Sequence, residues 1–562
     1  MTGHRELRAP GPVPRPPGVE ARAGRFPGPS LIPKLEAIQA EHGWLPREEL
    51  VRLAQAERRP LYELQGLVSF YPHFRTDGPP PAVDLAVCRD LPCWLAGADE
   101  RLAELRERYA GDPDVAVREV SCLGRCDCAP AVWANERTGP AASADALVAG
   151  LRAGSLPRPG PPRERRVWPN DPYDGGPSDY RLARALLAGE LDPETVIARL
   201  QEAELRGMGG AGFPTGVKWR LVRAEEDDVK YAICNADESE PGTFKDSQIL
   251  CDQPHLVLEG LLLGMLVVGA AQGYVFIRHE YVPEADAIRT ELARLRELGL
   301  VGPDATGGPR EIDVFVSPGG YILGEETALL EAMEGHRGEP RNKPPFPGTY
   351  GLWGRPTLVN SVETLADVPA ILERGPAWWR AQGTNGATGL KFVAVSGDVA
   401  SPAVYCVPLG TTIADLLALA GGPRDGRPFA AVQPGGASSS FVGPDRVDSP
   451  LDFAALQEAG SMLGSGAVVA CAEGTNLLAA ATNVLRFFRD ESCGKCVPCR
   501  VGSTKAHAIL ASLLAAGGGP EDVDERIPAL EETLRLTSIC GLGQVALGPV
   551  VSVLRLAGAT RA

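Results

Sequence analysis

Hydrophobic spacing changes period along the chain, and each change predicts a different kind of element. Apolar residues recur at helical spacing from Leu31 to Ile38, and the stretch 45–71 continues as short helices. Between 82 and 153, strand-like and helical pieces alternate, and VDLAVC predicts a strand that ends on Cys88. The pattern therefore predicts a helical segment followed by a small domain that contains both strands and helices.

A larger α/β region follows a linker rich in proline and charge at 156–176. Helical segments alternate with the strand-like runs VKYAIC (229–234) and YVFI (274–277), which predicts a largely parallel sheet covered by helices. Short β-like runs return at 391–471, and the rest of the chain is mostly helical. The longest apolar run, 260–271, has twelve residues. A bilayer span needs about 20 residues, so we predict a buried helix there and no direct membrane insertion.

These patterns give a multidomain α/β fold class. The predicted divisions are a disordered proline-rich tail at 1–28, a helical segment at 29–80, a small α/β domain at 81–155, the linker at 156–176, an α/β domain at 177–390, a β-rich domain at 391–471 and a helical domain at 472–562.

Composition narrows the class of protein. Hydrophobic residues make up 44% and charged residues 23% of the chain, which is typical of a soluble globular protein. The net charge of −16 argues against nucleic acid as a partner. An odd total of thirteen cysteines, with no visible secretory signal, argues against a disulfide framework. Grouped thiols in a reducing compartment favour metal ligation, and we expect a cytoplasmic protein.

The C-terminal cysteine group is the strongest metal signal. Cys493, Cys496 and Cys499 follow one another at intervals of three, and Cys540 comes forty residues later. Three thiolates on one short loop and a fourth from elsewhere suit a [4Fe–4S] cluster. Zinc also takes four cysteines and stays an alternative, although zinc ribbons usually use two separated pairs.

The N-terminal group consists of two pairs of cysteines. Cys88 and Cys93 form the first pair, and Cys122 and Cys126 form the second. Two pairs on two loops can hold a [2Fe–2S] core with one pair on each iron, whereas a zinc site or free buried thiols are the alternatives. Cys128 lies near enough in sequence to compete with Cys126.

Polar turns after apolar runs mark a candidate ligand site. Five glycines fall within 207–216, with Lys218 close behind, and glycines of this kind let a backbone approach a phosphate. A tight turn without a ligand is the alternative. The segment 235–240 (NADESE) follows a buried strand, where α/β sheets bind ligands, and 324–327 adds two carboxylates. A solvated acidic surface is the alternative, although three such polar turns in one domain argue against it without identifying the ligand.

Five long motifs, in order, resemble the NADH-binding flavoprotein subunit of respiratory complex I. They are LRGMGGAGFPTGVKW, CNADESEPGTFKD, GGYILGEETALLEAMEG, RNKPPFPGTYGLWGRPTLVNSVETL and ESCGKCVPCRVG. Upstream, LIPKLEAIQAEHGWLP, GLVSFYPHF and SCLGRC resemble the thioredoxin-like [2Fe–2S] subunit of the same complex. The two are fused here, as in soluble NAD-reducing hydrogenases and NAD-dependent formate dehydrogenases.

The resemblance implies a fold for each part and a function for the whole. It implies a thioredoxin-like domain, a Rossmann-like FMN and NADH domain, a ubiquitin-like β-grasp insert and a helical bundle that carries the [4Fe–4S] cluster. The implied function is an NAD(H)-dependent diaphorase module. It moves electrons between NADH, FMN and two iron–sulfur clusters, to or from a partner redox subunit of complex I, hydrogenase or formate dehydrogenase type. No side chain need act as acid or base, because the cofactor carries the chemistry.

The resemblance also implies site residues. Those implied to hold the flavin are Gly207, Gly209, Gly210, Lys218, Asn235, Asp237, Glu238, Ser239, Tyr321, Gly324, Glu325 and Asn360. Those implied to lie near the nucleotide are Phe213, Phe346, Glu240, Glu326 and Lys343. The implied ligands are Cys88, Cys93, Cys122 and Cys126 for [2Fe–2S], and Cys493, Cys496, Cys499 and Cys540 for [4Fe–4S].

Three positions depart from the family pattern. Met208 stands where the family usually has arginine, Leu221 replaces an aromatic residue, and Ser361 replaces the second asparagine of a pair. A non-catalytic electron-relay or assembly subunit would explain these changes, and a zinc-stabilised scaffold is a third hypothesis. The intact Asn235 and Glu240 favour the enzyme.

Overall fold

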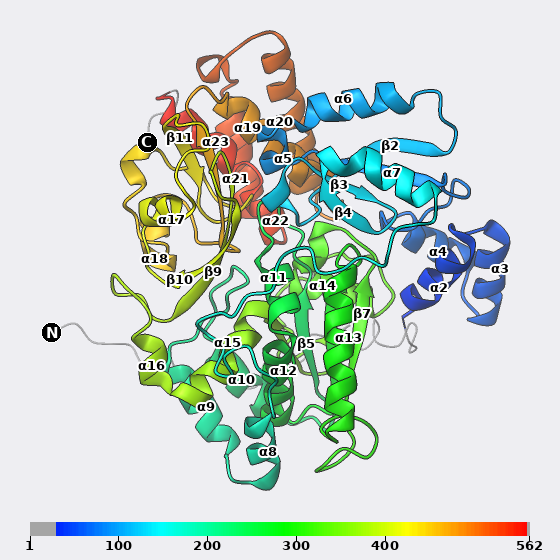
Figure 1. The fold of residues 1–562 in the computed structure, drawn as a ribbon, viewed down its shortest axis with the longest axis vertical. Coiled ribbons are helices and arrows are strands. Elements are labelled where there is room, and N and C mark those ends of the chain that lie inside the picture. The colour runs from blue at the N-terminus through cyan, green and yellow to red at the C-terminus, as the bar shows by residue number, and fades with distance from the viewer. Residues whose placement is uncertain (1–29, 559–562) are drawn as a thin grey trace.

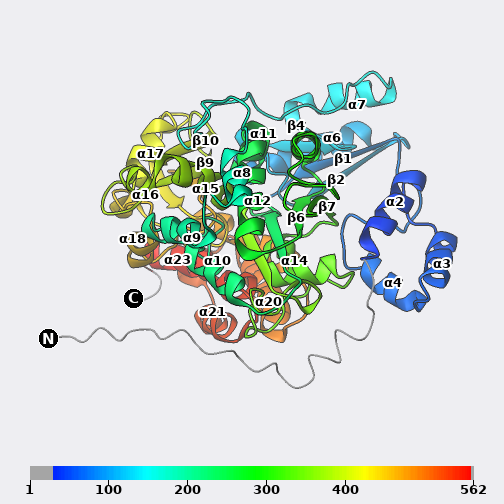
Figure 2. The same cartoon turned by 90° about the horizontal axis from the view of Figure 1, so that it is seen from below.

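The computed structural model describes residues 30–558, so the predicted tail at 1–28 lies outside the described residues. Three short helices come first and form a lobe at one side of the molecule (Figure 2). They are α2 (Ile32–His42), α3 (Arg47–Ala56) and α4 (Leu61–Val68). The lobe is attached to the large domain by the Tyr71 hydroxyl, which donates to the His336 carbonyl at 2.5 Å.

The small domain is built on a four-stranded sheet of order β2-β1-β3-β4. β1 is parallel to β2 and antiparallel to β3, and all six of its residues are buried. The predicted strand VDLAVC is confirmed, and it ends on Cys88. The elements are β1 (Val83–Cys88), α5 (Leu91–Leu95), α6 (Ala98–Tyr109), β2 (Val115–Val120), β3 (Ala131–Ala134), β4 (Arg137–Pro140) and α7 (Ala144–Arg152).

The large domain has a fully parallel sheet of order β7-β6-β5-β8 (Figure 1). Its strands are β5 (Tyr231–Ala236), β6 (Gln272–Arg278), β7 (Glu311–Ser317) and β8 (Thr357–Ser361). Both predicted runs lie in strands, although VKYAIC is shifted by two residues relative to β5. β6 and β7 lie on one side of β5 and β8 lies on the other, so the strand order reverses between β5 and β8. Open α/β sheets bind ligands at the carboxyl ends of the strands at such a switch point.

Helices cover both faces of this sheet. They are α8 (Arg181–Ala188), α9 (Pro193–Glu202), α10 (Thr215–Ala224), α11 (Lys245–Asp252), α12 (Pro254–Val268), α13 (Val282–Glu297), α14 (Glu326–Met333), α15 (Val362–Arg374) and α16 (Pro376–Arg380). α12 contains most of the predicted apolar run and is almost wholly buried. Within residues 30–558, no single helix has the length and apolarity to cross a membrane, although the pair α11–α12, bent by 92°, meets that test by length and composition.

The third sheet has the order β10-β9-β12-β11, with β9 and β12 parallel and both outer pairs antiparallel. Its elements are β9 (Leu390–Gly397), β10 (Ala403–Pro408), α17 (Ile413–Leu419), β11 (Phe429–Gln433), α18 (Phe453–Glu458) and β12 (Ala467–Ala472). A buried ion pair joins it to the large domain, because Lys391 Nζ lies 2.5 Å from a Glu363 carboxylate oxygen of α15.

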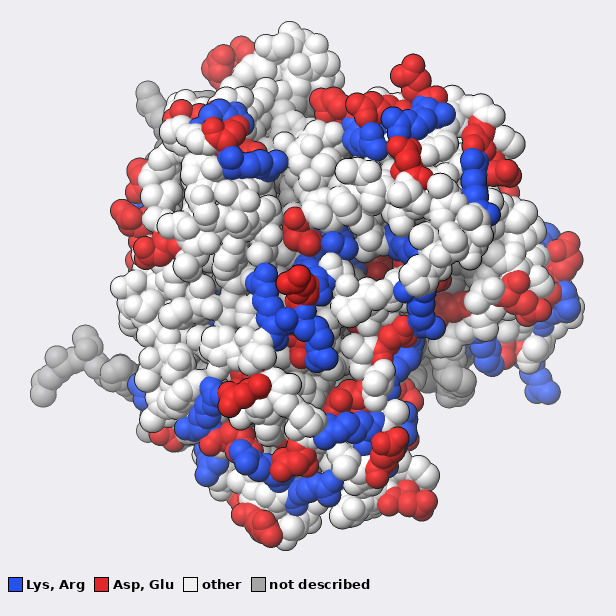
Figure 3. Space-filling view, viewed as in Figure 1, with Lys and Arg blue, Asp and Glu red and all other residues white. Residues whose placement is uncertain are grey.

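The C-terminal region is helical, as predicted. It contains α19 (Leu477–Asp490), α20 (Val497–Ala515), α21 (Arg526–Thr537), α22 (Gly541–Val545) and α23 (Gly548–Leu556). Short 3-10 turns lie at η1 (Cys126–Cys128), η2 (Ala141–Ser143), η3 (Tyr321–Gly324), η4 (Leu352–Gly354), η5 (Pro444–Arg446) and η6 (Pro520–Asp522). Figure 3 shows basic and acidic side chains intermixed over the face that it displays.

Candidate functional site

The glycine-rich loop between α9 and α10 is folded against the end of β8. The Gly207 N–H donates to the Phe213 carbonyl at 2.9 Å, which closes the loop on itself. A Cβ at Gly209 would lie 3.1 Å from the Cβ of Ser361, the last residue of β8. Gly210 has φ +123° and faces the backbone of Gly464. The loop thus meets the switch point and the third domain, and α10 begins directly after it.

The end of β5 meets the turn before α14. The Asn235 amide donates to the Gly324 carbonyl at 2.9 Å. Asp237 accepts a bond of 3.0 Å from the Ser317 hydroxyl and a second from Ser239. Burial raises the pKa of Asp237 to about 7, although these hydroxyl donors oppose the shift. Two of the segments predicted to bind a ligand therefore lie side by side.

Glu238 points into the protein. Its carboxylate accepts bonds from the N–H groups of Asp246 and Ser247 at 2.8 and 3.1 Å, at the start of α11. The Tyr281 hydroxyl donates to it at 2.9 Å. Burial is the main reason that the pKa of Glu238 rises to about 7. Both carboxylate oxygens are thus occupied by donors of the chain itself.

Glu240 is held by a serine that the sequence did not single out. The Ser438 N–H donates to Glu240 at 2.8 Å, and the Ser438 hydroxyl bonds the same oxygen. That hydroxyl also lies 3.3 Å from the Tyr321 hydroxyl. Burial raises the pKa of Glu240. The only local signal for Ser438 was the run GGASSS, in which two glycines precede three serines.

Two lysines and two glutamates gather at the start of α14. Glu325 caps this helix by accepting from its first N–H groups. Lys343 Nζ donates to Glu325 at 2.9 Å and to Glu326 at 3.1 Å. Burial lowers the pKa of Lys343, but the two carboxylates outweigh it and raise the pKa overall. Lys218 Nζ lies 4.0 Å from Glu326, so all four predicted residues are brought together.

The two predicted aromatic residues face outward. Phe213 is 44% exposed and Phe346 is 59% exposed, so both rings are accessible from solvent. Asn360, at the end of β8, is buried and accepts from the Trp219 indole N–H at 3.0 Å. Met208, the departure from arginine, is buried in the core of the large domain.

The four N-terminal cysteines lie together and are buried, each at most 3% exposed. The hydrogen bond to Cys93 is the largest cause of the raised pKa of Cys88, ahead of burial. The bond to Cys122 does the same for Cys126, and each pair also senses the charge of the other. The structure thus brings both predicted pairs into one site.

Backbone donors point at these sulfurs. The Gly124 N–H lies 3.4 Å from Cys122 Sγ, and the Ala131 N–H lies 3.4 Å from Cys93 Sγ. N–H···S bonds of this kind favour the thiolate that binds iron. Cys128 instead directs its thiol at the Arg125 carbonyl, at 3.5 Å.

The four late cysteines also converge. Burial raises the pKa of Cys499 to about 11, and Cys496 and Cys493 add to the shift. Burial raises the pKa of Cys540 to about 12, and Cys493 contributes again. Tyr321 lies between this group and Glu240. Burial raises the pKa of Tyr321, and the negative charges of Glu240 and Cys540 raise it further.

Comparison with known proteins follows this division of the chain. Four known domains match: the thioredoxin-like [2Fe–2S] ferredoxin at 25–153, the Nuo51 FMN-binding domain at 200–370, the SLBB domain at 392–441 and the NADH-ubiquinone oxidoreductase-F iron–sulfur binding region at 479–557.

Two curated relatives match at the level of the whole chain or its larger part. The F subunit of the NADH-quinone oxidoreductase of Escherichia coli (strain K12) is 40% identical over 384 residues, which are 67% of this chain and 85% of that protein. The alpha subunit of the NAD-reducing hydrogenase HoxS of Cupriavidus necator is 35% identical over 558 residues, 93% of this chain and 90% of that one. The chain belongs to this flavoprotein subunit family.

A solved structure agrees with the assignment. A chain in the crystal structure of an NAD+-reducing [NiFe]-hydrogenase in the H2-reduced state has a TM-score of 0.83 and 31% identity, with 95% of this chain and 94% of that chain covered. The predicted function is confirmed: this flavoprotein subunit is an NADH dehydrogenase whose cofactors are FMN, [2Fe–2S] and [4Fe–4S]. These relatives are named as subunits of an NADH-quinone oxidoreductase and of a NAD-reducing hydrogenase.

The donor groups of the flavoprotein subunit fit these cofactors. Each cluster has four thiols in one place, and soft thiolates are the ligands that iron–sulfur clusters take. At the switch point, the backbone of the glycine loop packs so closely on Ser361 that a Cβ at Gly209 would lie 3.1 Å from it, and the Asn235 amide lies at the end of the neighbouring strand. A flat, polar-edged ring with a phosphate suits this combination.

Proposed function

We propose that the flavin lies at the carboxyl ends of β5 and β8, under the glycine-rich loop. The observation that carries this is the packing of Gly209 on Ser361, beside Asn235. The strand order β7-β6-β5-β8 corresponds to the order 3-2-1-4 of a Rossmann-like sheet, in which the switch point lies between strands 1 and 4, here β5 and β8. The residues that would hold the flavin are Gly207, Gly209, Gly210, Lys218, Asn235, Asp237, Ser239, Tyr321, Gly324, Glu325 and Asn360.

Glu238 has a different role in this proposal. Its carboxylate fixes the start of α11 and the Tyr281 hydroxyl, so it holds the segment after β5 in place. The nucleotide would lie across the outward-facing rings of Phe213 and Phe346, which offer stacking surfaces to adenine. Glu240, Glu326 and Lys343 would bind its polar groups.

The two cysteine groups would each ligate one cluster. Cys88, Cys93, Cys122 and Cys126 would hold [2Fe–2S], and Cys493, Cys496, Cys499 and Cys540 would hold [4Fe–4S]. The three sheets and the last helices support domain divisions at 81–155, 177–390, 391–471 and 472–562. The order β10-β9-β12-β11, with parallel central strands, supports a ubiquitin-like β-grasp fold for 391–471.

In this mechanism the chain's own residues would bind and orient the flavin and the nucleotide and shield them from water. When bound, FMN supplies the exchange between the paired electrons of NADH and the single electrons of the clusters. The loop at 207–212 and the donors of β5 and β8 would hold and orient the ring. Glu240 bonds Ser438, whose hydroxyl lies beside that of Tyr321, and the Tyr321 ring packs on Phe487 of α19, in the domain that holds the late thiols. We assign no side chain as general acid or base.

We further propose partners of hydrogenase or formate dehydrogenase type. The hydrogenase relative matches 93% of this chain, fused [2Fe–2S] domain included, whereas the Escherichia coli relative matches 67%. Purification of the native complex, followed by analysis for Ni, Mo and W, tests this. Nickel identifies the first type and molybdenum or tungsten the second, and a complex without these metals contradicts both.

The flavin site can be tested by displacing the glycine-rich loop that is proposed to cover it. Gly209→Val puts a branched side chain against Ser361, so we expect at least a tenfold loss of bound FMN and of the absorbance that NADH bleaches. Gly111→Val is the control, because no atom lies within 4 Å of a Cβ at Gly111. Normal flavin content in Gly209→Val would refute the proposed site. Wild-type protein that NADH does not bleach would favour the non-catalytic relay.

A further inference from the structure

Two arginines from other parts of the chain bond the loop that carries Cys122 and Cys126. Arg278, the last residue of β6, donates from Nη2 to the Cys122 carbonyl at 2.7 Å. Arg163, in the linker between the domains, donates from Nη2 to the Gly124 carbonyl at 2.8 Å. Both contacts reach the backbone of the cysteine loop, directly beside the sulfur ligands.

The other side of each guanidinium bonds the segment that follows β5. Arg278 Nη1 donates to the Glu238 carbonyl at 2.5 Å. Arg163 Nη1 donates to the Ser247 hydroxyl at 2.9 Å, and Ser247 is the third residue of α11, the first helix after β5. Each arginine therefore spans from the cysteine loop to the segment after β5, with one planar group that donates in two directions.

Both charges are shielded from water but paired. The side chains of Arg278 and Arg163 are 2% and 11% exposed. Arg278 lies 2.8 Å from Glu280, and Arg163 lies 2.8 Å from Asp127. A guanidinium can satisfy a carboxylate and two further acceptors at once, which the single ammonium of lysine cannot do in the same geometry.

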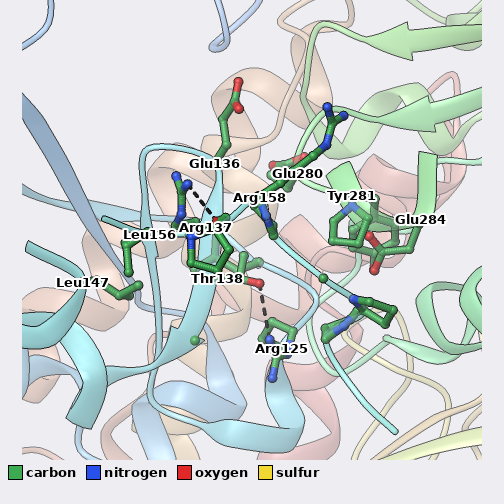
Figure 4. Close-up of a pocket in the computed structure, with 18 of the residues that line it drawn as sticks. Arg125, Glu136, Arg137, Thr138, Leu147, Leu156, Arg158, Glu280, Tyr281 and Glu284 are labelled. Atoms are coloured by element: carbon green, nitrogen blue, oxygen red, sulfur yellow. Dashed lines mark hydrogen bonds between the residues drawn. The ribbon is translucent and has the colours of Figure 1, made fainter. Parts of the chain in front are cut away.

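The linker therefore connects the two domains through hydrogen bonds as well as through the covalent chain. Figure 4 shows it passing beside a cavity of about 400 Å³ between the two domains, with Arg125 and Thr138 on one side and Tyr281 and Glu284 on the other. Arg158, which lines this cavity and precedes Arg163 in the linker, pairs with Asp286 but is 72% exposed. Of these two linker arginines, Arg163 is the one that reaches the cysteine loop.

We infer that Arg163 and Arg278 are positioning residues. They hold the loop that carries Cys122 and Cys126 against the segment after β5, and they raise the reduction potential of the [2Fe–2S] cluster. Reduction adds one electron to the cluster, and a cation held nearby in a poorly hydrated site stabilises the added charge. The inference rests on the proposed ligation of that cluster by the four N-terminal cysteines.

The test measures the cluster rather than turnover. Arg163→Gln removes the linker charge, and Arg278→Lys keeps the charge but loses the double contact. Arg158→Gln is the matched control, because it removes an exposed arginine from the same linker. The midpoint potential of the [2Fe–2S] signal is measured by redox titration with electron paramagnetic resonance. Hydrogen–deuterium exchange at 121–128 reports the docking of the loop.

For Arg163→Gln we expect the one-electron equilibrium to shift at least threefold toward the oxidised cluster. At 59 mV per tenfold change, this lowers the midpoint potential by about 28 mV or more. In both variants we expect exchange at 121–128 to be at least tenfold faster, with Arg158→Gln unchanged. Wild-type potential and exchange in both variants would overturn the inference. If Arg163→Gln does not fold, Arg163→Lys takes its place. Lysine keeps the charge but cannot make both hydrogen bonds, so this variant is tested only by the rate of hydrogen–deuterium exchange at 121–128. A wild-type protein without a [2Fe–2S] signal would instead refute the ligation.

Discussion

The backbone N–H of Ser438 donates to a Glu240 carboxylate oxygen at 2.8 Å, and this bond fixes the loop after β11 to the segment after β5. Since the Ser438 hydroxyl also approaches Tyr321, one serine connects the SLBB domain, the flavin domain and the approach to the late cysteines. The relationship makes Glu240 a junction between domains as well as a candidate nucleotide contact.

Replacing Glu240 by alanine should chiefly weaken nucleotide binding. The loss of a buried, hydrogen-bonded acceptor costs about 1–3 kcal/mol, so we expect KM for NADH to rise about tenfold or more. Steady-state kinetics with ferricyanide, together with flavin content, measure this. Ser438→Ala keeps the backbone donor and should change KM much less. An unchanged KM in Glu240→Ala, with flavin bound, would contradict the assigned contact.

Cys496→Ala should separate the two halves of the reaction. We expect it to lose the iron and sulfide of the [4Fe–4S] cluster, because a cluster with three thiolates is held less tightly. NADH-dependent ferricyanide reduction should persist in part, whereas reduction of the co-purified partner subunits should stop. Cys471→Ala, which removes a buried thiol of β12, serves as the control. Continued partner reduction in Cys496→Ala would rule out a linear path through this cluster.

Cys126 and Cys128 can be told apart by single serine substitutions. Cys126 is 3% exposed and bonds Cys122, whereas Cys128 is turned toward the Arg125 carbonyl. We therefore expect Cys126→Ser to lose the [2Fe–2S] signal in electron paramagnetic resonance and Cys128→Ser to keep it. The opposite pattern would show that Cys128 is the ligand.

Glu259, buried in α12, should make the stability of the large domain depend on pH. It accepts from the Tyr173 and Ser178 hydroxyls at 2.8 and 2.9 Å, and burial raises its pKa from 4.5 to about 7. A raised pKa means that the stabilising contribution is complete below pH 4.5 and is lost as the pH rises through 7.

Glu259→Gln should remove this dependence. Relative to the variant, the wild type should lose roughly 3 kcal/mol between pH 5 and pH 8. That loss corresponds to about 5–10 °C in the midpoint of thermal unfolding. Glu190→Gln, at an exposed carboxylate, is the control and should keep the wild-type pH profile. Parallel profiles for wild type and Glu259→Gln would contradict the prediction.

Much of the fold was predictable because its signals are local. Short apolar runs identified β1 and most of β5 and β6, since such runs depend on neighbours in sequence. The ends of the strands differ from the prediction. β5 extends to Ala236, because its pairing with β6 continues beyond the apolar run. The apolar run at 260–271 was correctly predicted as buried helix, and Gly260 allows it to pack closely on α15 at Leu365.

By itself, the sequence determined the family, the order of the domains and the residue types of the cysteine and glycine motifs, because these depend on spacing within short segments. Tertiary structure alone decided the direction of Glu238 toward α11, the bond between Ser438 and Glu240, and the contact of Arg163 with the cysteine loop. The latter two contacts join residues 198 and 39 positions apart. Such pairings arise only when separate hydrophobic cores pack together, and no local pattern encodes which polar groups then meet.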